Sequence, residues 1–526
     1  MNELASICPA NSSPEKKVFV KVQSMSVIGM ESYPVTVEVD VSQGLPQFAT
    51  VGLPDASVKE SRDRIKAAIK NSGYAFPRDH VTVNLAPADI RKEGTGFDLP
   101  IAVGILAAEA LIGEAALDGC LFIGELSLDG SIKGVRGVLP AAFKARESGI
   151  RSIFVPEENA AEAAMVEGVC VYGVRSLPDV VEFLGDRKTI EPLCVNADDL
   201  FQINRRYDID FSEIKGQKLA LRALEIAAAG SHNLLMIGPP GSGKSMLARR
   251  LPTILPDLSF EEAIEVTKVF SVAGLLSAGE TLIAARPFRA PHHTISDVGL
   301  VGGGQMPHPG EISLAHLGVL FLDELPEFKR NALEALRQPL EDGTITITRS
   351  AVTTAFPAKF MLVAAMNPCP CGYFGDRVRR CRCSPQQIRQ YQAKISGPLL
   401  DRIDLHVEVP SVQYRALTGK ENNESSAEVR KRVVGARRRQ KERFGGAAIP
   451  ANARMTEKQI RSFCSIDEES HQLMEMAVEK LGLSARAMNR ILKVSRTIAD
   501  LDGAEKIGAA HVAEAIQYRS LDRNIV

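Results

Sequence analysis

Two spacings of apolar residues occur in the first third of the chain, and they predict different elements. Residues 35–39 and 81–85 alternate between apolar and polar, which predicts strands because successive strand side chains face opposite sides. Apolar residues recur at helical spacing in residues 57–71, 99–110 and 140–148. This mixture of strands and helices predicts an independent α/β domain over residues 17–185.

The middle of the chain contains short, continuous apolar runs instead. Residues 234–237, 319–322 and 360–366 are apolar throughout, as strands of a parallel sheet are when helices cover both faces. Helical spacing then continues from residue 451 to residue 526. The sequence therefore predicts an α/β protein with a helical C-terminal segment.

Polar and charged stretches separate these regions. The predicted divisions are a flexible tail over 1–16, the α/β domain over 17–185, a linker over 186–206, a parallel-sheet core over 207–412, a basic helical linker over 413–450 and a helical lid over 451–526. A chain of 526 residues is long enough for about three domains at ~150 residues each.

Composition limits the class of protein. Lys and Arg number 63 against 64 Asp and Glu, so the net charge of -1 neither attracts nor repels nucleic acid as a whole. No apolar run reaches the ~18 residues of a membrane span, and no signal-peptide pattern opens the chain. Nine cysteines in a chain of this kind favour thiols or a metal site over disulfides. We expect a cytoplasmic protein that does not contact membranes.

A glycine-rich loop follows the first apolar run and precedes a helix-forming segment. It fits the pattern G-x-x-x-x-G-K-[ST] at every fixed position, with Gly238, Pro239, Pro240, Gly241, Ser242, Gly243, Lys244 and Ser245. Glycines let backbone amides approach phosphates at the positive end of a helix dipole. The lysine of such a loop reaches the β- and γ-phosphates, and the hydroxyl binds Mg²⁺. The pattern predicts that Lys244 and Ser245 bind ATP and Mg²⁺.

The second apolar run ends in two acids, Asp323 and Glu324. A strand of the same parallel sheet would bring Asp323 beside the phosphate loop, where it can complete the coordination of Mg²⁺. Glu324 is suited to orient and deprotonate the attacking water. A single acid here is also typical of the first turn of a helix, which favours negative charge. The pair, downstream of a phosphate loop, favours an ATP-hydrolysing site.

With both motifs and a helical C-terminal segment, the chain resembles AAA+ ATPases. Asn367 follows the third apolar run and is similar to the sensor that helps place the hydrolytic water. Residues 397–404 resemble the arginine-finger segment, with Arg402 as its candidate, and Arg486 resembles the second sensor. An arginine finger stabilises charge on the γ-phosphate of a neighbouring subunit. The resemblance therefore implies a homo-oligomeric ring, most often a hexamer, with a trans arginine finger.

The closer resemblance is to the magnesium-chelatase-like branch of these ATPases, and specifically to the YifB/ComM family. It rests on residues 286–294, 302–304, 309–316 and 367–372. Members of this branch share inserted elements with replicative helicase motors, and residues 344–350 fit such a β-hairpin. Arg349 at its turn is then a candidate for DNA contact in the pore. Adjacent His292 and His293 would face opposite sides of a strand, which disfavours a metal site there.

The N-terminal domain resembles the proteolytic domain of Lon proteases, of the ribosomal S5 type, in residues 129–134 and 149–159. Lon-type hydrolysis needs a serine nucleophile that a lysine activates. In this chain Gly96 stands at the serine position and Leu139 at the lysine position. Nearby hydroxyl and amino groups lie at shifted positions, which misplaces them for this chemistry. We predict a catalytically inactive Lon-like domain.

Four of the nine cysteines lie together in an insert at residues 369–383: Cys369, Cys371, Cys381 and Cys383. Two close thiol pairs on a turn-forming sequence can bind one tetrahedral Zn²⁺, although C-x-C is tighter than the usual spacing. The arginines that interleave with this cluster are Arg377, Arg379, Arg380 and Arg382. They suit contact with a phosphate backbone, or else form a solvated basic loop.

A second basic run spans residues 430–443. Runs of this kind are usually solvated faces of helices, and an electrostatic patch for DNA is the alternative. Its one aromatic neighbour, Phe444, gives little support for stacking on single-stranded bases.

The function predicted from the sequence is a ring-forming, ATP-dependent motor on single-stranded or branched DNA. The ATPase chemistry follows from the residues, whereas helicase or branch-migration activity in homologous recombination and natural transformation is implied by the family resemblance. Two alternatives stay open. A magnesium-chelatase motor subunit is disfavoured by the Lon-like domain and the cysteine segment, and a protein-remodelling ATPase is disfavoured by Gly96 and Leu139.

Overall fold

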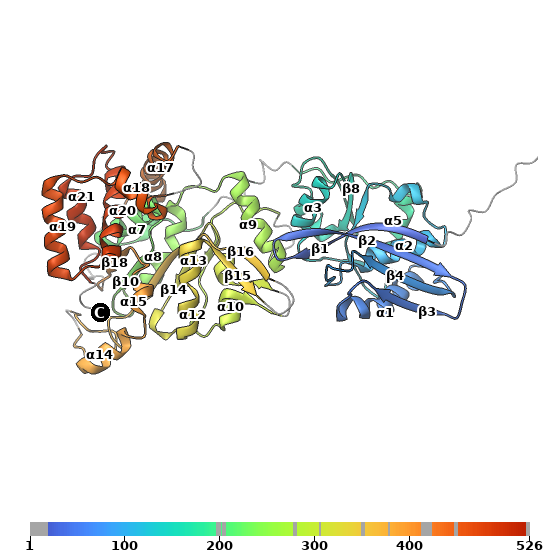
Figure 1. Ribbon diagram of the computed structural model, residues 1–526, viewed down its shortest axis with the longest axis horizontal. Helices are drawn as coiled ribbons and strands as arrows, with labels where there is room; N and C mark the ends of the chain where they lie inside the picture. Colours follow the sequence, from blue (N-terminus) through green and yellow to red (C-terminus); the bar gives the residue numbers. More distant parts are fainter. Residues whose placement is uncertain are drawn as a thin grey trace, which may run out of the picture. The chain divides into compact units, whose positions relative to one another are not determined.

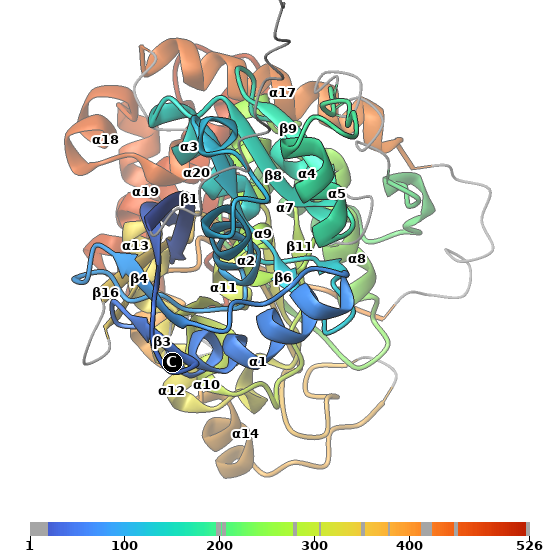
Figure 2. The same cartoon turned by 90° about the vertical axis from the view of Figure 1, so that its right-hand side faces the viewer.

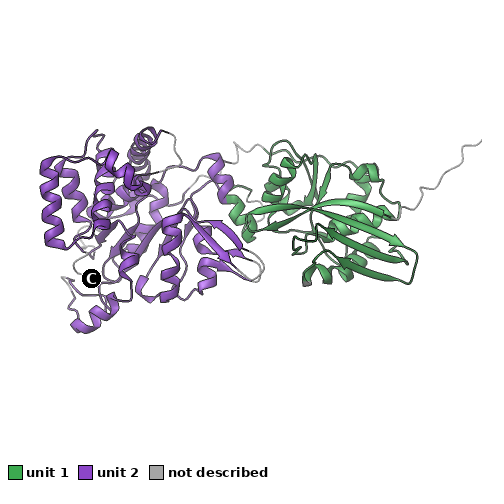
Figure 3. Ribbon diagram, viewed as in Figure 1, with its two compact units in different colours: residues 1–200, 267–282 green, residues 201–266, 283–526 purple. Residues whose placement is uncertain are grey.

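The computed structural model describes residues 19–195, 201, 207–276, 281–304, 307–348, 353–376, 379–411, 423–445 and 451–521. The chain divides into two compact units (Figure 3). Unit 1 comprises residues 1–200 and 267–282, and unit 2 comprises residues 201–266 and 283–526. Several predictions fall wholly or partly outside the described residues: the tail at 1–16, the linker at 186–206, Arg349 and Arg377.

Unit 1 is built on a seven-stranded sheet with the order β3-β4-β2-β1-β5-β8-β9. Strands β1, β2 and β4 pair antiparallel, whereas β5, β8 and β9 continue the sheet in parallel. Alternate residues of β2 and β4 are buried, which confirms the strands predicted at 35–39 and 81–85. The strands are β1 (Phe19–Ile28), β2 (Glu31–Ser42), β3 (Gln47–Val51), β4 (His80–Ala86), β5 (Cys120–Phe122), β8 (Ser152–Pro156) and β9 (Cys170–Val174), with a separate pair β6 (Glu125–Leu126) and β7 (Ile132–Lys133).

The helices of unit 1 confirm the three predicted from apolar spacing. Helix α2 is buried along its whole length and packs on β1 and β2, since its residues are almost all apolar. Figure 2 shows α4 and α5 beside β8 and β9 at one end of the sheet. The helices are α1 (Ala56–Asn71), α2 (Asp98–Ala108), α3 (Val138–Glu147), α4 (Glu157–Ala163) and α5 (Leu177–Leu184), with a 3-10 turn η1 (Glu114–Leu117).

Unit 2 contains a five-stranded, wholly parallel sheet with the order β11-β14-β17-β10-β18 (Figure 1). Every residue of β10, β14 and β17 is buried, as expected for strands covered on both faces. These three strands confirm the prediction that the three apolar runs of the sequence form strands of a parallel sheet. The sheet consists of β10 (Leu234–Ile237), β11 (Phe288–Arg289), β14 (Val319–Leu322), β17 (Met361–Met366) and β18 (Leu405–Glu408).

Helices surround this sheet and make up the C-terminal part of unit 2. Those before residue 411 are α7 (Lys218–Gly230), α8 (Lys244–Arg250), α10 (Asp297–Val301), α11 (Glu311–Leu314), α12 (Arg330–Ala335), α13 (Arg337–Asp342), α14 (Pro385–Gln392) and α15 (Gly397–Leu400). Helix α9 (Phe260–Ala273) begins in unit 2, and its residues from 267 onward belong to unit 1. Those after residue 411 are α17 (Ser426–Arg443), α18 (Glu457–Phe463), α19 (Glu468–Leu481), α20 (Ala485–Leu501) and α21 (Ala509–Gln517). The helical character predicted beyond residue 451 is thus confirmed. Among the described residues, no helix has the length and apolar character needed to cross a bilayer.

Short elements complete unit 2. The 3-10 turns are η2 (Phe211–Glu213), η3 (Leu251–Ile254), η4 (Leu325–Glu327) and η5 (Asn452–Arg454). Two strand pairs stand outside the main sheet: β12 (Gly302–Gly303) with β13 (His308–Pro309), and β15 (Thr344–Thr348) with β16 (Thr353–Pro357). The second pair is antiparallel and matches the hairpin predicted from residues 344–350.

The basic run predicted as a linker forms α17. This helix packs in the core of unit 2, whereas a separate linker was predicted. Val429, Val433 and Ala436 are buried in the core of unit 2, where α17 packs on α7 and α20. Several arginines of the helix bind partners within the unit: Arg430 binds Asp257 and the Thr253 carbonyl, Arg432 binds Glu225 and Glu424, Arg439 binds the Asp500 carbonyl, and Arg443 binds the Asp500 carboxylate. The helix is therefore not a separate linker, because many of its charges join elements distant in sequence, while Lys431, Arg438 and Lys441 remain on a solvated face.

A buried polar cluster joins β18 to the C-terminal helices. Asp404, just before β18, is 4% exposed and accepts hydrogen bonds from Arg490 of α20 and from the Asn233 amide. His232 Nδ1 lies 3.1 Å from Asp404 Oδ2, and its Nε2 lies 2.8 Å from Thr497 Oγ1. Burial alone would raise the pKa of Asp404, but the charge of Arg490 and the contact with His232 hold it below the usual value. The carboxylate is thus kept charged inside the fold.

Replacing Asp404 by Asn should destabilise unit 2, because Arg490 then keeps its charge in a mostly buried place without a counter-charge. Breaking a buried pair in this way costs about 3–5 kcal/mol, so the midpoint of urea unfolding should fall clearly. Glu408→Gln, at the exposed end of β18, is the matched control and should leave the midpoint nearly unchanged. Equal midpoints for the two variants would contradict this role of Asp404.

Candidate functional site

The glycine-rich loop, residues 238–245, connects the end of β10 to the start of α8. Gly241 and Gly243 have φ of +75° and +89°, in the left-handed region that favours glycine. A Cβ at Gly238 would lie 2.1 Å from the Val409 carbonyl oxygen, so the loop passes close to the chain that follows β18. Gln217 Nε2 donates to the Ser242 carbonyl at 2.6 Å. The conformation of the loop therefore depends on its glycines and on neighbours from two other segments.

Lys244, the first residue of α8, points back over this loop. Its Nζ donates to the carbonyls of Gly238 and Pro239 at 2.7 and 3.0 Å, and to Asn367 Oδ1 at 3.3 Å. Burial lowers the pKa of Lys244, while the nearby charges of Asp323 and Glu324 favour its charged form. The structure thus brings together two residues that the sequence separates widely, the loop lysine and the polar residue after β17.

Ser245 and Asp323 also meet. Ser245 Oγ donates to Asp323 Oδ2 at 2.7 Å, from the start of α8 to the end of β14. A hydroxyl and a carboxylate are hard oxygen donors, and Mg²⁺ prefers such donors together with phosphate oxygens and waters. The donor set therefore fits Mg²⁺, which Ser245 and Asp323 could hold beside the loop.

Glu324 adopts an unusual backbone conformation next to Asp323. Its φ is +52°, in the left-handed region, and its amide donates to Asp323 Oδ1 at 2.9 Å. The carboxylate is about half exposed, and its Oε2 lies 3.3 Å from His293 Nδ1. The second acid of the pair thus points toward a histidine that the sequence reasoning did not assign to the site.

The prediction that His292 and His293 face opposite sides is wrong. Both lie in the loop after β11 rather than in a strand, and their ring centroids are 4.1 Å apart. Ion pairing fixes the strand before them, because Arg289 contacts both carboxylate oxygens of Glu311 at 2.6 and 2.7 Å. No local pattern in the Pro-His-His-Thr segment indicates that it reaches Glu324.

Arg402 lies apart from this group in the described contacts. Its side chain is mostly buried, forms an ion pair with Glu341 and donates to the Pro398 carbonyl at 2.6 Å. Glu341 itself is 57% exposed, so the pair lies at the surface edge of the unit. Within one chain, the residue predicted to act as an arginine finger is therefore held by an acid of α13.

Arg486 lies in the first turn of α20 and is exposed to solvent. The described contacts do not connect it with Lys244, Asp323 or Asn367. One turn further along the same helix, Arg490 instead binds the buried Asp404. The two arginines of α20 thus differ, since the second has a structural partner and the first projects outward.

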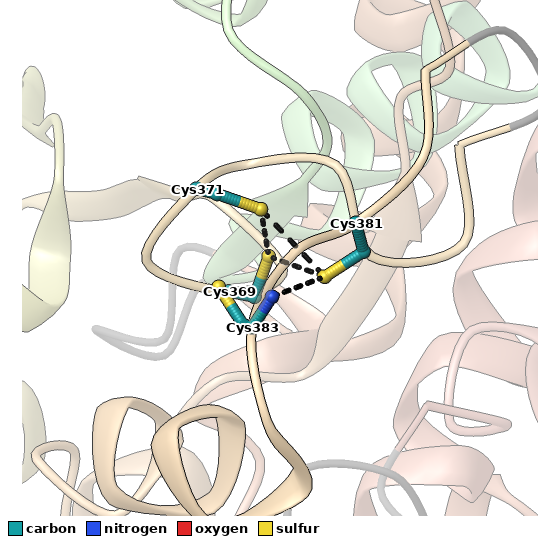
Figure 4. A group of neighbouring side chains, drawn as sticks. All are labelled: Cys369, Cys371, Cys381 and Cys383. Carbon is teal, nitrogen blue, oxygen red and sulfur yellow. Dashed lines mark hydrogen bonds between the residues drawn. The ribbon is translucent and has the colours of Figure 1, made fainter.

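The four predicted cysteines come together in one place (Figure 4). The Sγ of Cys369 lies 3.4 Å from that of Cys371 and 3.7 Å from that of Cys381, and the last two sulfurs are 3.6 Å apart. All four sulfurs, including that of Cys383, lie within 4.8 Å of one another. A tetrahedral Zn²⁺ with Zn–S of about 2.3 Å requires sulfurs about 3.8 Å apart, so the donor set fits zinc.

The thiols of the cluster differ in pKa: that of Cys371 is lowered, whereas those of Cys381 and Cys383 are raised, because a backbone hydrogen bond to each is outweighed by burial and the neighbouring thiols. Backbone amides of Arg382 and Tyr373 donate to Cys371 and lower its pKa to about 6. Metal ligation by cysteine needs the thiolate, so a lowered pKa favours binding near neutral pH. The cluster begins with the fully buried Cys369, two residues after Asn367.

The positions that matter for Lon-type hydrolysis lie in unit 1. A Cβ at Gly96 would contact Ile123 at 3.4 Å, and Leu139 is fully buried. The nearby Thr95 hydroxyl binds the Glu125 carboxylate, and Lys144 Nζ binds Glu147 at 2.9 Å near the surface. These two alternative groups therefore have separate partners and do not form a nucleophile–base pair in the described contacts.

Three family models cover most of the chain. They are "Magnesium chelatase, subunit ChlI" over residues 210–417, "Subunit ChlI of Mg-chelatase" over 37–159 and "Magnesium chelatase, subunit ChlI C-terminal" over 423–519. The three matches thus fall on both units of the structure.

Whole-chain relatives agree with these models. The chain is 47% identical over 507 residues to the competence protein ComM of Haemophilus influenzae. This match covers 95% of this chain and 97% of that protein. It is 44% identical to the uncharacterized protein YifB of Escherichia coli, in a match of 507 residues that covers 96% of this chain and 98% of that protein. A magnesium-chelatase 67 kDa subunit of Chlorobaculum parvum is 29% identical over 164 residues, or 30% of this chain and 23% of that protein.

Proposed function

We propose that this chain, which belongs to the magnesium-chelatase-like YifB/ComM family, is a ring-forming AAA+ ATPase that uses ATP hydrolysis to move along DNA. The observation that carries the proposal is the convergence of Lys244, Ser245, Asp323 and Asn367 at one edge of the parallel sheet, through contacts of 2.7 and 3.3 Å. Residues of these types at this place suit phosphate and Mg²⁺ binding.

In this mechanism the loop amides and Lys244 bind the phosphates, and Ser245 and Asp323 hold Mg²⁺. Bound Mg²⁺ neutralises charge that develops on the transferring phosphoryl group. Glu324 accepts a proton from the attacking water, while Asn367 helps to position that water. The lowered pKa of Lys244 is expected to rise when phosphates approach, since nearby negative charge favours the ammonium form.

A ring supplies the remaining catalytic charge. We propose that Arg402 exchanges Glu341 for the γ-phosphate held by a neighbouring copy of the chain, where its guanidinium stabilises the transition state. The exposed Arg486 contacts nucleotide and couples hydrolysis to rotation of the helical lid. Such a head-to-tail contact between identical chains gives a closed ring when its rotation returns to the first chain, and a hexamer is the proposed number.

DNA is the proposed substrate, either single-stranded or branched. Support comes from the name of the Haemophilus influenzae relative, which is a competence protein, and from charge at the cysteine segment. Arg380 and Arg382 are exposed there, as is Arg389 of the adjoining α14, whereas the arginines of α17 largely bind internal partners. We therefore assign phosphate contacts to the cysteine segment rather than to α17. Helicase or branch-migration activity in homologous recombination during natural transformation, in the cytoplasm, is the proposed role.

A magnesium-chelatase motor subunit is the second candidate, because all three family models carry that description. The relative named as a chelatase subunit shares only 30% of this chain, which favours the DNA motor. A protein-remodelling ATPase has less support, since Gly96 and Leu139 leave unit 1 without a peptidase pair and we propose that it is inactive as a protease.

ATP turnover should rise several-fold with single-stranded, forked or four-way-junction DNA and should move the labelled strands. Glu324→Gln should lower turnover by about 100-fold or more, because the attacking water loses its base. Glu327→Gln, a nearby exposed acid paired with Lys394, is the matched control and should remain active. Turnover that ignores all three DNAs would overturn the DNA substrate, and no turnover at all would overturn the ATPase assignment.

We also propose that Cys369, Cys371, Cys381 and Cys383 hold one structural Zn²⁺. Elemental analysis of the purified protein should find about one zinc per chain, as a four-thiolate site requires. A quadruple Cys→Ser variant should lose it, whereas Cys170→Ser with Cys194→Ser, two exposed thiols outside the cluster, should keep it. Equal zinc in all three proteins would show that the cluster is not the site.

A further inference from the structure

The cysteine segment and the phosphate loop are in direct contact. Gly372, between Cys371 and Tyr373, has a φ of +83°, and a Cβ there would lie 2.5 Å from Pro240 Cδ and 2.8 Å from Pro240 Cγ. That distance is far below van der Waals contact, so only a glycine allows this approach. Pro240 is the third residue of the phosphate loop, and the loop is thus packed against the backbone of the cysteine segment.

A second connection runs through the residue that follows β17. Asn367 accepts a hydrogen bond from Lys244, and Cys369 comes only two residues later. Gln392, at the end of α14, donates through Nε2 to the Pro368 carbonyl at 3.2 Å. The short stretch from Asn367 to Cys369 is therefore restrained from both ends, by the lysine on one side and by the cysteine segment with its helix on the other.

Metal binding would restrain both connections at once. Four ligands on one ion close the chain between Cys369 and Cys383 and fix the backbone that carries Gly372. Without the ion the same segment keeps the thiol contacts between Cys369, Cys371 and Cys381 and weaker restraints such as the hydrogen bond from Arg379 to the Tyr373 hydroxyl. The position of Pro240 and the orientation of Asn367 then depend on a loop with more conformational freedom.

We propose that the four-cysteine metal site positions the phosphate loop and Asn367, so that zinc occupancy sets the affinity of this chain for ATP. Gly372 is the positioning residue in this coupling, since it makes the contact with Pro240 but touches neither the metal nor the phosphates. The inference rests on the proposed nucleotide and zinc sites, and it adds that the conformation of one site depends on the other.

The test compares two glycines of the same segment in the full-length protein. Gly372→Ala and Gly375→Ala impose similar backbone strain, because φ is +83° and +78°, but a Cβ at Gly375 meets no described atom within 4 Å. Binding of a fluorescent ATP analogue with Mg²⁺ should weaken roughly tenfold or more in Gly372→Ala, since small displacements of a binding group are costly. Gly375→Ala should stay within about twofold of the unchanged protein, and both variants should keep their zinc.

Metal removal gives an independent measurement that needs no variant. Stripping zinc with a chelator should weaken binding of the ATP analogue, and adding Zn²⁺ back should restore it, with helix content by circular dichroism constant throughout. Equal affinities for the two glycine variants, or stripped protein that binds the analogue normally, would overturn the coupling alone. If the protein without substitutions contains no zinc as purified, the metal site is wrong. If that protein does not bind the analogue, the nucleotide site is wrong. The coupling would fail in either case.

Discussion

The parallel alignment of three neighbouring strands is the constraint on which unit 2 depends. In the sheet, Ile237 at the end of β10 lies opposite Met366 of β17, and Leu322 at the end of β14 lies opposite Ala364. All three strands therefore end at the same edge, where parallel sheets place ligands. The chain that leaves β17 runs between the other two, so Asn367 reaches the lysine of the phosphate loop while Asp323 reaches Ser245.

Internal ion pairs hold the elements that surround this edge. Arg289 with Glu311 fixes the edge strand that precedes His293, and Arg432 ties α17 to Glu225 of α7. Both pairs are partly exposed, so they orient these elements more than they add to the free energy of folding. They also determine which arginines are paired within the fold and which stay exposed for contact with other molecules. The basic run of α17 is largely used within the fold, so the exposed arginines near the cysteine cluster become the better candidates for phosphate contact.

Local patterns predicted the elements well, and they picked out two segments, residues 238–245 and 319–324, whose side chains meet at the sheet edge. Continuous apolar runs located β10, β14 and β17, and the glycine-rich loop and Asp323 followed directly from them. The contacts that were missed join residues far apart in sequence. His293 reaches Glu324 through a loop, and Gly372 touches Pro240 across the sheet edge, neither of which has a local signal. The role of α17 was also missed, since Arg432 and Glu225 are 207 positions apart.

ATP hydrolysis by mixed assemblies is the measurement to make first, since it asks whether one chain completes the site of another. Glu324→Gln chains would lack the base but keep Arg402, and Arg402→Ala chains would lack the finger but keep Glu324. Each should be inactive alone, and an equal mixture should regain hydrolysis at about a quarter of its interfaces. A mixture that co-assembles, judged by co-purification of the untagged variant with the tagged one, yet remains as inactive as its components would contradict a ring with a shared catalytic site.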